Sequence, residues 1–381
     1  MFRKTFAQID LSALRKNLKL IRSHFGQERF LCPMVKANAY GHGDVRIAQE
    51  LWAQGVSVLG VCLIEEGVLL RAFGLKSQIL IFRGFDAHGA REIIAQGLTP
   101  VVSSWEHLDH LEAEVKSDPV SVHIKFDTGM NRLGFSLSEA ERLIERLKRS
   151  PKIRVSAVLT HLAQGEDGFQ TEGMTARQLR SFFPVAQRFR QEFQAIVHAL
   201  NSGAIVSAMS SSALPEHLTL MDWGLRPGLM LYGYNPVRGV EIPLEPVMTL
   251  KSHVQVLRWL RPGEGVSYGA TWKAKVDSLI GVVPIGYADG YHRILSNKSE
   301  VLVCGERVPV IGAICMDYLM IDLTRLKNER HLQGAEVVLF GKQGNQHISA
   351  DELAQKAQTI TWEILTSVGE RVPRIYAEGV A

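Results

Sequence analysis

Short apolar runs alternate with longer amphipathic segments through the first 235 residues of the chain. The runs have the length and the Val, Ile and Leu content of buried strands, whereas the intervening segments repeat apolar residues at helical spacing. Eight runs follow this pattern, and they comprise residues 30–36, 56–62, 78–82, 98–102, 120–126, 154–160, 195–200 and 229–233. Eight strands separated by helices predict an α/β fold of the (β/α)8 TIM-type barrel class.

The pattern changes beyond about residue 240. Strand-like stretches then follow one another and are separated by turn sequences such as RPGEG and GKQG. One late helix is expected at 350–358, where Ser349 and Glu352 have the spacing of a capping box. We therefore predict two domains: residues 1–238 form the barrel, and residues 239–381 form a mostly β domain.

Composition and charge narrow the class of protein. The formal net charge is only +4 and the basic residues are scattered, which argues against a nucleic-acid partner. The sequence has neither a run of 18 apolar residues nor a signal peptide at its N-terminus, so we expect a cytoplasmic protein without a membrane partner. The four cysteines form no C-x-x-C pair, so neither a metal site nor a disulfide framework is expected.

Chemically useful side chains fall at the carboxyl ends of the predicted strands, where barrel enzymes build their active sites. The clearest is Lys36. A lysine at a strand end is usually a solvated surface residue, but Lys36 follows the apolar run FLCPMV. An apolar wall favours the neutral amine, which is the form that attacks a carbonyl carbon. Lys125 lies at the end of the fifth run, His161 follows the sixth, and Asn201 and Ser202 follow the seventh, whereas Arg226 and Gly228 precede the eighth.

The string VKANAYGHG, residues 35–43, resembles the cofactor-lysine signature of the alanine racemase family. The resemblance continues through HIKFDTGMNRLGF, LTHLA, NSGA, LRPGLMLYG, VSYGATW, PIGYADGY, GAICMDY and RVPRIY. It implies a barrel-plus-β-domain isomerase that uses pyridoxal 5′-phosphate (PLP) to interconvert L-alanine and D-alanine, supplying D-alanine for peptidoglycan. It also implies a homodimer in which the second domain of each subunit contributes to the partner's active site.

The resemblance implies two catalytic residues, Lys36 and Tyr268. Lys36 binds PLP covalently and then serves as the base on one face of the substrate, and Tyr268 of the partner subunit serves on the other face. Racemisation requires one acid–base group on each face, because a proton must leave one face of a planar carbon and return to the opposite face. Without the resemblance, Tyr268 beside Gly269 would be interpreted as a packing residue at a turn.

The resemblance also implies binding residues. Ser202 could instead be a helix N-cap and His161 a core histidine, because neither residue type is specific to a cofactor site. Arg226 faces the pyridine nitrogen with support from His161, Arg132 binds the substrate carboxylate, and Lys125 is the possible carbamylated lysine beside Arg132. The remaining cofactor-binding residues are Tyr40, Asn201, Ser202, Gly228 and Leu229, and the residues that close the substrate pocket are Tyr287, Met316 and Asp317.

One position departs from the family pattern, and several questions stay open. Some relatives carry a tyrosine immediately before the RVPR string, where this chain has Glu370. A barrel-type PLP decarboxylase, a non-catalytic PLP carrier and an interaction protein with a decayed site are the alternative classes. Serine is an open alternative substrate, because an apolar pocket discriminates by only about 1–3 kcal/mol per methylene.

Overall fold

The structure is a computed structural model, and it describes residues 3–170, 172–211, 222–327 and 331–379. The chain divides into two compact units. The barrel unit comprises Arg15–Ala39 and Asp44–Glu245, and the β unit comprises Met1–Leu14, Tyr40–Gly43 and Pro246–Ala381. The predicted domain boundary between residues 238 and 239 stays a prediction.

The barrel unit is built around a parallel sheet that nearly closes on itself. Residues 31–34 fill the gap between the first and last strands, because Leu31 pairs with Leu225 and Met34 pairs with Gly60. The sheet therefore confirms the predicted barrel-type fold. Its seven strands lie in sequence order: β2 (Val58–Val61), β3 (Gln78–Ile81), β4 (Thr99–Val102), β5 (Val120–Lys125), β6 (Ile153–Leu159), β7 (Ile196–Asn201) and β8 (Gly224–Arg226).

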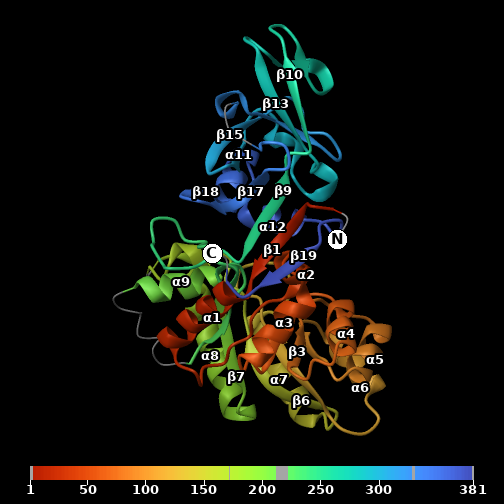
Figure 1. Cartoon of the computed structure of the whole chain (residues 1–381). Helices are drawn as coiled ribbons and strands as arrows, with labels where there is room; N and C mark the ends of the chain where they lie inside the picture. The colour runs from red at the N-terminus through yellow and green to blue at the C-terminus, as the bar shows by residue number, and fades with distance from the viewer. Residues whose placement is uncertain (1–2, 171, 212–221, 328–330, 380–381) are drawn as a thin grey trace. The chain divides into compact units, whose positions relative to one another are not determined.

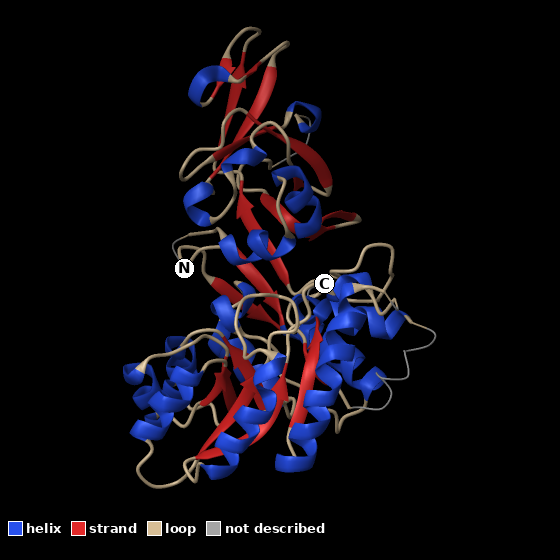
Figure 2. Ribbon diagram, turned by 180° about the vertical axis from the view of Figure 1, so that it is seen from behind, coloured by secondary structure: helices blue, strands red, loops and turns tan. Residues whose placement is uncertain are grey.

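Helices surround these strands, as Figure 2 shows for the lower part of the chain. Helix α7 (Ala140–Arg149) is amphipathic. Leu143, Ile144 and Leu147 are buried on one face, and the charged side chains occupy the other face, as their helical spacing predicts. The other helices are α1 (Leu11–Phe25), α2 (Lys36–Tyr40), α3 (Asp44–Ala53), α4 (Ile64–Ala72), α5 (Ala87–Ala95), α6 (Trp105–Glu114), α8 (Met174–Phe193) and α9 (Ser202–Ser210), with short 3-10 turns η1 (Leu137–Glu139) and η2 (Gly165–Asp167).

The strand predicted at 229–233 is wrong. Residues Leu229–Tyr232 form the 3-10 turn η3, and the last strand of the sheet is β8, Gly224–Arg226. All four residues of η3 are buried, so the apolar run records burial rather than extended backbone. Arg226 therefore ends the last barrel strand instead of preceding it.

The β unit contains a mixed sheet in the order β10-β13-β16-β15-β14-β17-β9-β1-β19, with β18 paired to β17 (Figure 1). Only β1 and β19 are parallel neighbours on this path; the other pairs are antiparallel. This confirms the predicted mostly β domain. The strands are β1 (Phe6–Asp10), β9 (Met248–His253), β10 (Val256–Leu260), β13 (Ser278–Val283), β14 (Glu300–Val303), β15 (Glu306–Ile311), β16 (Leu319–Asp322), β17 (Glu336–Gln343), β18 (Gln346–Ile348) and β19 (Arg374–Ala377).

Short elements complete the β unit. The late helix predicted at 350–358 is confirmed as α11 (Ala350–Ala357), and the Ser349 side chain accepts a hydrogen bond from the Glu352 N–H at 3.0 Å. The other elements are the strand pair β11 (Gly265–Val266) and β12 (Trp272–Lys273), the turns η4 (Tyr268–Ala270), η5 (Tyr287–Asp289), η6 (Arg293–Leu295) and η7 (Thr324–Leu326), and helix α12 (Thr361–Ser367).

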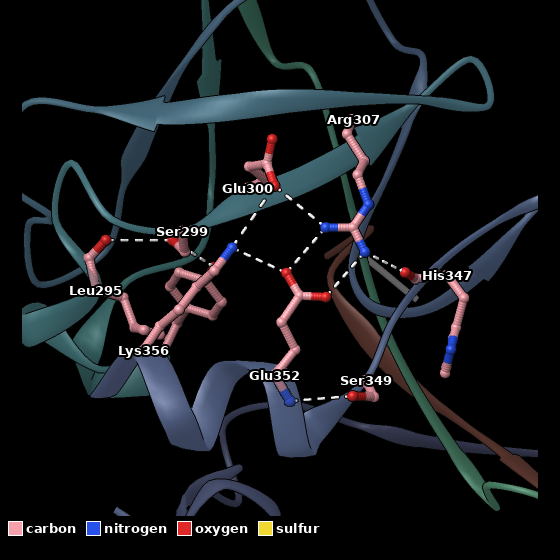
Figure 3. Close-up of polar contacts among 9 residues, drawn as sticks. Leu295, Ser299, Glu300, Arg307, His347, Ser349, Glu352 and Lys356 are labelled. Atoms are coloured by element: carbon pink, nitrogen blue, oxygen red, sulfur yellow. Dashed lines mark hydrogen bonds and ion pairs between the residues drawn. The ribbon is translucent and has the colours of Figure 1, made fainter. Parts of the chain in front are cut away.

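A four-charge cluster fastens α11 to the sheet of the β unit (Figure 3). Arg307 of β15 donates to both carboxylate oxygens of Glu352, at 2.9 and 2.8 Å, and to Glu300 of β14 at 3.1 Å. Lys356 also bonds Glu352, at 2.8 Å. These hydrogen bonds, that of Arg307 first, lower the pKa of Glu352 to about 2.

No helix within residues 3–170, 172–211, 222–327 and 331–379 combines the length and apolar character needed to cross a bilayer. Nor do those ranges hold a group of three or more His, Cys, Asp and Glu side chains arranged to bind a metal ion.

Candidate active site

Lys36 stands at the start of an unusual turn. The strand predicted at 30–36 is reduced to isolated bridges at Leu31 and Met34, and Lys36 follows this bridging segment. The next residues, Ala37, Asn38, Ala39 and Tyr40, have φ angles of 52°, 54°, 50° and 55°. None of these is glycine, and left-handed helical backbone costs residues such as alanine and tyrosine about 1–2 kcal/mol each, although asparagine tolerates it better. The turn is therefore a strained conformation that neighbouring groups must stabilise.

Three hydrogen bonds within the barrel unit stabilise this turn. The Ala39 N–H donates to the Val35 carbonyl at 2.9 Å. The Asn38 side chain accepts from the Asp44 N–H at 3.0 Å. The third bond comes from Ala37, whose N–H donates to the carboxylate of Glu66 on α4 at 2.6 Å.

Lys125 ends β5, as predicted, and only 5% of it is exposed. Burial, followed by the charges of Arg132 and Arg226, lowers the pKa of Lys125 to about 8. About a tenth of the protein molecules therefore carry a neutral Lys125 amine at pH 7, far more than for an ordinary lysine. Arg132 lies on the loop beyond β5 and is exposed.

The Arg132 loop is shaped by one carboxylate. Asp127 accepts hydrogen bonds from the backbone N–H groups of Gly129, Asn131 and Arg132, at 2.8, 3.1 and 2.9 Å. These bonds lower the pKa of Asp127 against the opposing effect of burial. Asn131 has a φ of 56°, a conformation that asparagine tolerates better than most residues.

Arg226 is buried at the end of β8 and is held by neutral acceptors. Its Nη2 donates to the carbonyl oxygens of Thr160 at 2.7 Å and Ala199 at 3.2 Å, and lies 3.3 Å from Nδ1 of His161. Its Nη1 lies 2.8 Å from Nδ1 of His198. Burial lowers the pKa of Arg226 to about 10, so the guanidinium stays charged at neutral pH.

The same contacts show what sequence reasoning missed. His198 on β7, rather than His161, makes the shorter imidazole contact to Arg226, and His198 in turn contacts His123 on β5 at 2.9 Å. Burial, with the charge of Arg226, lowers the pKa of all three histidines. The available signal was a histidine flanked by apolar residues inside each of two predicted strand runs, VSVHIKF and AIVHAL.

The N-terminus of α9 meets η3 at the ends of β7 and β8. Asn201, not Ser202, is the N-cap of α9, because its side-chain oxygen accepts from the Ala204 N–H at 3.1 Å. Ser202 is almost fully buried, and its hydroxyl oxygen accepts from the Gly228 N–H at 2.8 Å. Leu229, the first residue of η3, lies next along the chain. Four predicted cofactor-binding residues are thus brought together within the barrel unit.

In the β unit, three predicted residues line one pocket of about 670 Å³. They are Tyr268, Met316 and Asp317, and Tyr268 is 73% exposed in the single chain. Tyr287 lies beside this segment, because its N–H donates to the Cys315 carbonyl at 3.1 Å.

The remaining predicted positions also belong to the β unit. Asp317 accepts a hydrogen bond from Arg371 at 2.6 Å. Tyr40 is buried, and burial raises its pKa. Glu370, the position that departs from the family pattern, is exposed.

The fold and these side chains define a barrel enzyme with a β-rich second domain, and comparisons with known proteins identify the family. Residues 9–236 match the family model "Alanine racemase, N-terminal domain", and residues 247–376 match "Alanine racemase, C-terminal domain". The chain is similar to an alanine racemase of Sorangium cellulosum, with 38% identity over 390 residues, 99% of this chain and 100% of that protein.

Solved structures agree. The alanine racemase of E. faecalis superposes with a TM-score of 0.89 at 30% identity, covering 98% of both chains. That of Bartonella henselae, with covalently bound pyridoxal phosphate, superposes with a TM-score of 0.85 at 31% identity, covering 98% of this chain and 99% of that one. This chain therefore belongs to the alanine racemase family and is an amino-acid racemase, which decides against the decarboxylase, carrier and interaction-protein alternatives.

Proposed function

We propose that this enzyme interconverts L-alanine and D-alanine with PLP as cofactor, using Lys36 on one face of the substrate and Tyr268 of the partner subunit on the other. The observation that carries the proposal is the gathering of an amine, a buried guanidinium and a helix N-terminus at the carboxyl ends of one set of barrel strands. The proposed biological role is D-alanine supply for peptidoglycan in the cytoplasm.

The residues of the barrel unit fit PLP. A phosphate needs several donors, and the N-terminus of α9 supplies backbone N–H groups and a favourable dipole. The Ser202 hydroxyl oxygen already accepts from Gly228, so its own proton is left to donate to an anion. The Nη atoms of Arg226 are occupied by protein acceptors, whereas its Nε–H has no partner among the described residues and can donate to the pyridine nitrogen.

Bound PLP supplies an electron sink for the pair of electrons left on the substrate Cα when its proton is removed. The side chains of the protein perform the binding and the proton transfer. Lys36 binds the cofactor, and its freed amine removes or returns the proton on its face of the substrate. Arg132 binds the substrate carboxylate, and carbamylated Lys125 is the anion beside it. Tyr287, Met316 and Asp317 limit the pocket to substrates with a small side chain.

A second copy of the chain is the proposed source of Tyr268. Its phenol and the Met316 side chain are 73% and 53% exposed, and both line the pocket of the β unit. Large exposed hydrophobic side chains that line a pocket are typical of a surface that another molecule covers. A homodimer with shared active sites accounts for this exposure.

Two measurements test the proposal. Borohydride reduction of the PLP-loaded protein followed by peptide mapping is expected to mark Lys36. Tyr268→Phe is expected to abolish inversion of both alanine antipodes while leaving the borohydride label in place, because the phenol is not needed to bind the cofactor. A Tyr268→Phe variant that inverts alanine at the parent rate would exclude the two-base arrangement.

A further inference from the structure

Glu66 is placed to control the backbone that carries Lys36. It lies in the first turn of α4, and its carboxylate accepts three backbone N–H groups. Oε2 accepts from Cys62 at 2.7 Å and Leu63 at 2.9 Å, whereas Oε1 accepts from Ala37 at 2.6 Å. Ala37 directly follows Lys36. One side chain thus joins the segment that follows β2 to the segment that follows the bridging residues 31–34.

Capping of α4 does not explain why Glu66 also accepts a hydrogen bond from Ala37. A glutamate at the third position of a helix commonly reaches back to the N–H of the cap residue, and here the bond to Leu63 does so. The bond from Ala37 to Oε1 contributes nothing to that cap. It reaches instead across 29 positions of sequence to the left-handed turn.

The turn depends on this bond more than on its own sequence. Ala37 is exposed and has only a methyl group, so its side chain cannot hold it in place. Its φ and ψ of 52° and 55° are unfavourable for alanine. A hydrogen bond to a charged acceptor is roughly twice as strong as a neutral one, so Glu66 provides the strongest single restraint on Ala37.

We propose that Glu66 is a positioning residue for Lys36, fixing the backbone on the carboxyl side of the lysine so that its amine is preorganised for the cofactor carbonyl. The inference rests on the proposed function, because that function gives Lys36 its role. Both carboxylate oxygens are needed as acceptors. An amide has one acceptor oxygen and presents an NH2 group to the donor on its other side.

The test compares Glu66→Gln with Glu65→Gln. Glu65 precedes Glu66 on α4, is exposed, and loses the same charge in its variant. The full chain is freed of cofactor and titrated with PLP, and the dissociation constant, the visible absorbance band, and kcat and KM for L-alanine are measured. For Glu66→Gln we expect roughly tenfold weaker PLP binding, an altered absorbance band and a reduced kcat at unchanged KM, since the loss of one charged hydrogen bond is of this order. For Glu65→Gln we expect parent values.

Amide hydrogen exchange on the cofactor-free parent gives an independent measurement. We expect the Ala37 amide to be protected, and to lose that protection in Glu66→Gln. Parent-like PLP binding and absorbance in Glu66→Gln, or equal losses in both variants, would overturn the inference. An unprotected Ala37 amide in the parent would overturn it even if Glu66→Gln did not fold. Absence of a borohydride label on Lys36 in the parent would instead sink the proposed function.

Discussion

Arg226 fixes the tautomer of His198. The guanidinium Nη1 can only donate, so Nδ1 of His198, 2.8 Å away, must carry the lone pair and Nε2 must carry the proton. That proton then faces Nδ1 of His123 at 2.9 Å, which sets the tautomer of the second imidazole in turn. A buried cation thereby orders two neutral histidines inside the barrel.

His198→Leu is expected to destabilise the barrel unit. The leucine removes the acceptor for Arg226 and the donor to His123, and each buried polar group left without a partner costs about 1–3 kcal/mol. Urea unfolding should show a loss of this order, whereas His88→Leu at an exposed position should change stability by less than about 0.5 kcal/mol. Equal unfolding midpoints for the two variants would contradict a structural role for the histidine pair.

The same pair predicts a pH dependence of stability. Burial, then the charge of Arg226, lowers the pKa of His123 from its ordinary value of 6.5 to about 3. As pH falls below 6.5, His123 binds a proton in the unfolded chain but stays neutral in the folded chain. The free energy of unfolding therefore declines from about pH 6.5 down to about pH 3. At pH 5 the loss for one such histidine is roughly 2 kcal/mol.

The check is urea unfolding at pH 7.5 and pH 5 for the parent and for His123→Leu. The variant should be less stable at pH 7.5, and its further loss on acidification should be smaller than the parent's. An identical pH dependence in the two proteins would show that His123 does not titrate on unfolding.

Much of this site could be predicted from the sequence, because long-range assembly follows from barrel topology. Once residues 30–36 and 120–126 are predicted as parallel runs of one barrel, Lys36 and Lys125, which lie at or next to their carboxyl ends, must lie at the same end of the sheet. Contacts within that end could not be predicted. His123 and His198 lie 75 positions apart, and nothing local specifies that they pair.

Local backbone conformation was the second feature that could not be predicted from the sequence. The left-handed turn after Lys36 contains no glycine in its four strained residues, so sequence carries no direct signal for it. The acceptor that stabilises it, Glu66, lies 29 positions beyond Ala37, on α4, and was not among the predicted site residues. The run at 229–233 was misassigned because burial and strand formation both select apolar residues, and only the backbone distinguishes them.

The four-charge cluster of the β unit should stabilise α11 in a pH-dependent way. Glu352→Gln keeps the size of the side chain but removes the charge that Arg307 and Lys356 contact, and we expect a loss of about 1–2 kcal/mol at pH 7. The folded pKa of Glu352 is about 2 and its ordinary value is 4.5. Its contribution is therefore complete above pH 4.5 and disappears as pH falls toward 2.

Unfolding of the parent and of Glu352→Gln at pH 7 and pH 3 tests this, with Glu245→Gln as the control. Glu245 pairs with Lys16 while 47% of its side chain is exposed, so its loss should cost less than about 0.5 kcal/mol. A difference between parent and Glu352→Gln that is as large at pH 3 as at pH 7 would exclude an ionic origin.

Lys125 is expected to react with carbon dioxide. With a pKa of about 8, Lys125 is a neutral amine in a fraction of the molecules near neutral pH. The nitrogen of this amine can bond to the carbon of CO2 while a proton passes to solvent. The resulting carbamate is an anion beside the positive charge of Arg132. With 13C-labelled bicarbonate we expect one carbamate resonance in the parent protein and none in Lys125→Met. Parent protein without that resonance would exclude the modification.

The proposed dimer with shared active sites predicts a result that differs from that expected when each subunit contains a complete active site. Lys36→Ala and Tyr268→Phe should each be inactive as homodimers, because every active site lacks one of the two bases. In a mixed dimer, one site draws its lysine from the Tyr268→Phe subunit and its tyrosine from the Lys36→Ala subunit, so it is intact. Mild denaturation, mixing and refolding of the two inactive proteins should therefore restore racemisation, up to about a quarter of the parent rate for random pairing at equal concentrations. Each variant refolded alone should stay inactive. Mixtures that form dimers without regaining activity would mean that Lys36 and Tyr268 of the same chain act together, and the exposure of Tyr268 in the single chain would need another explanation.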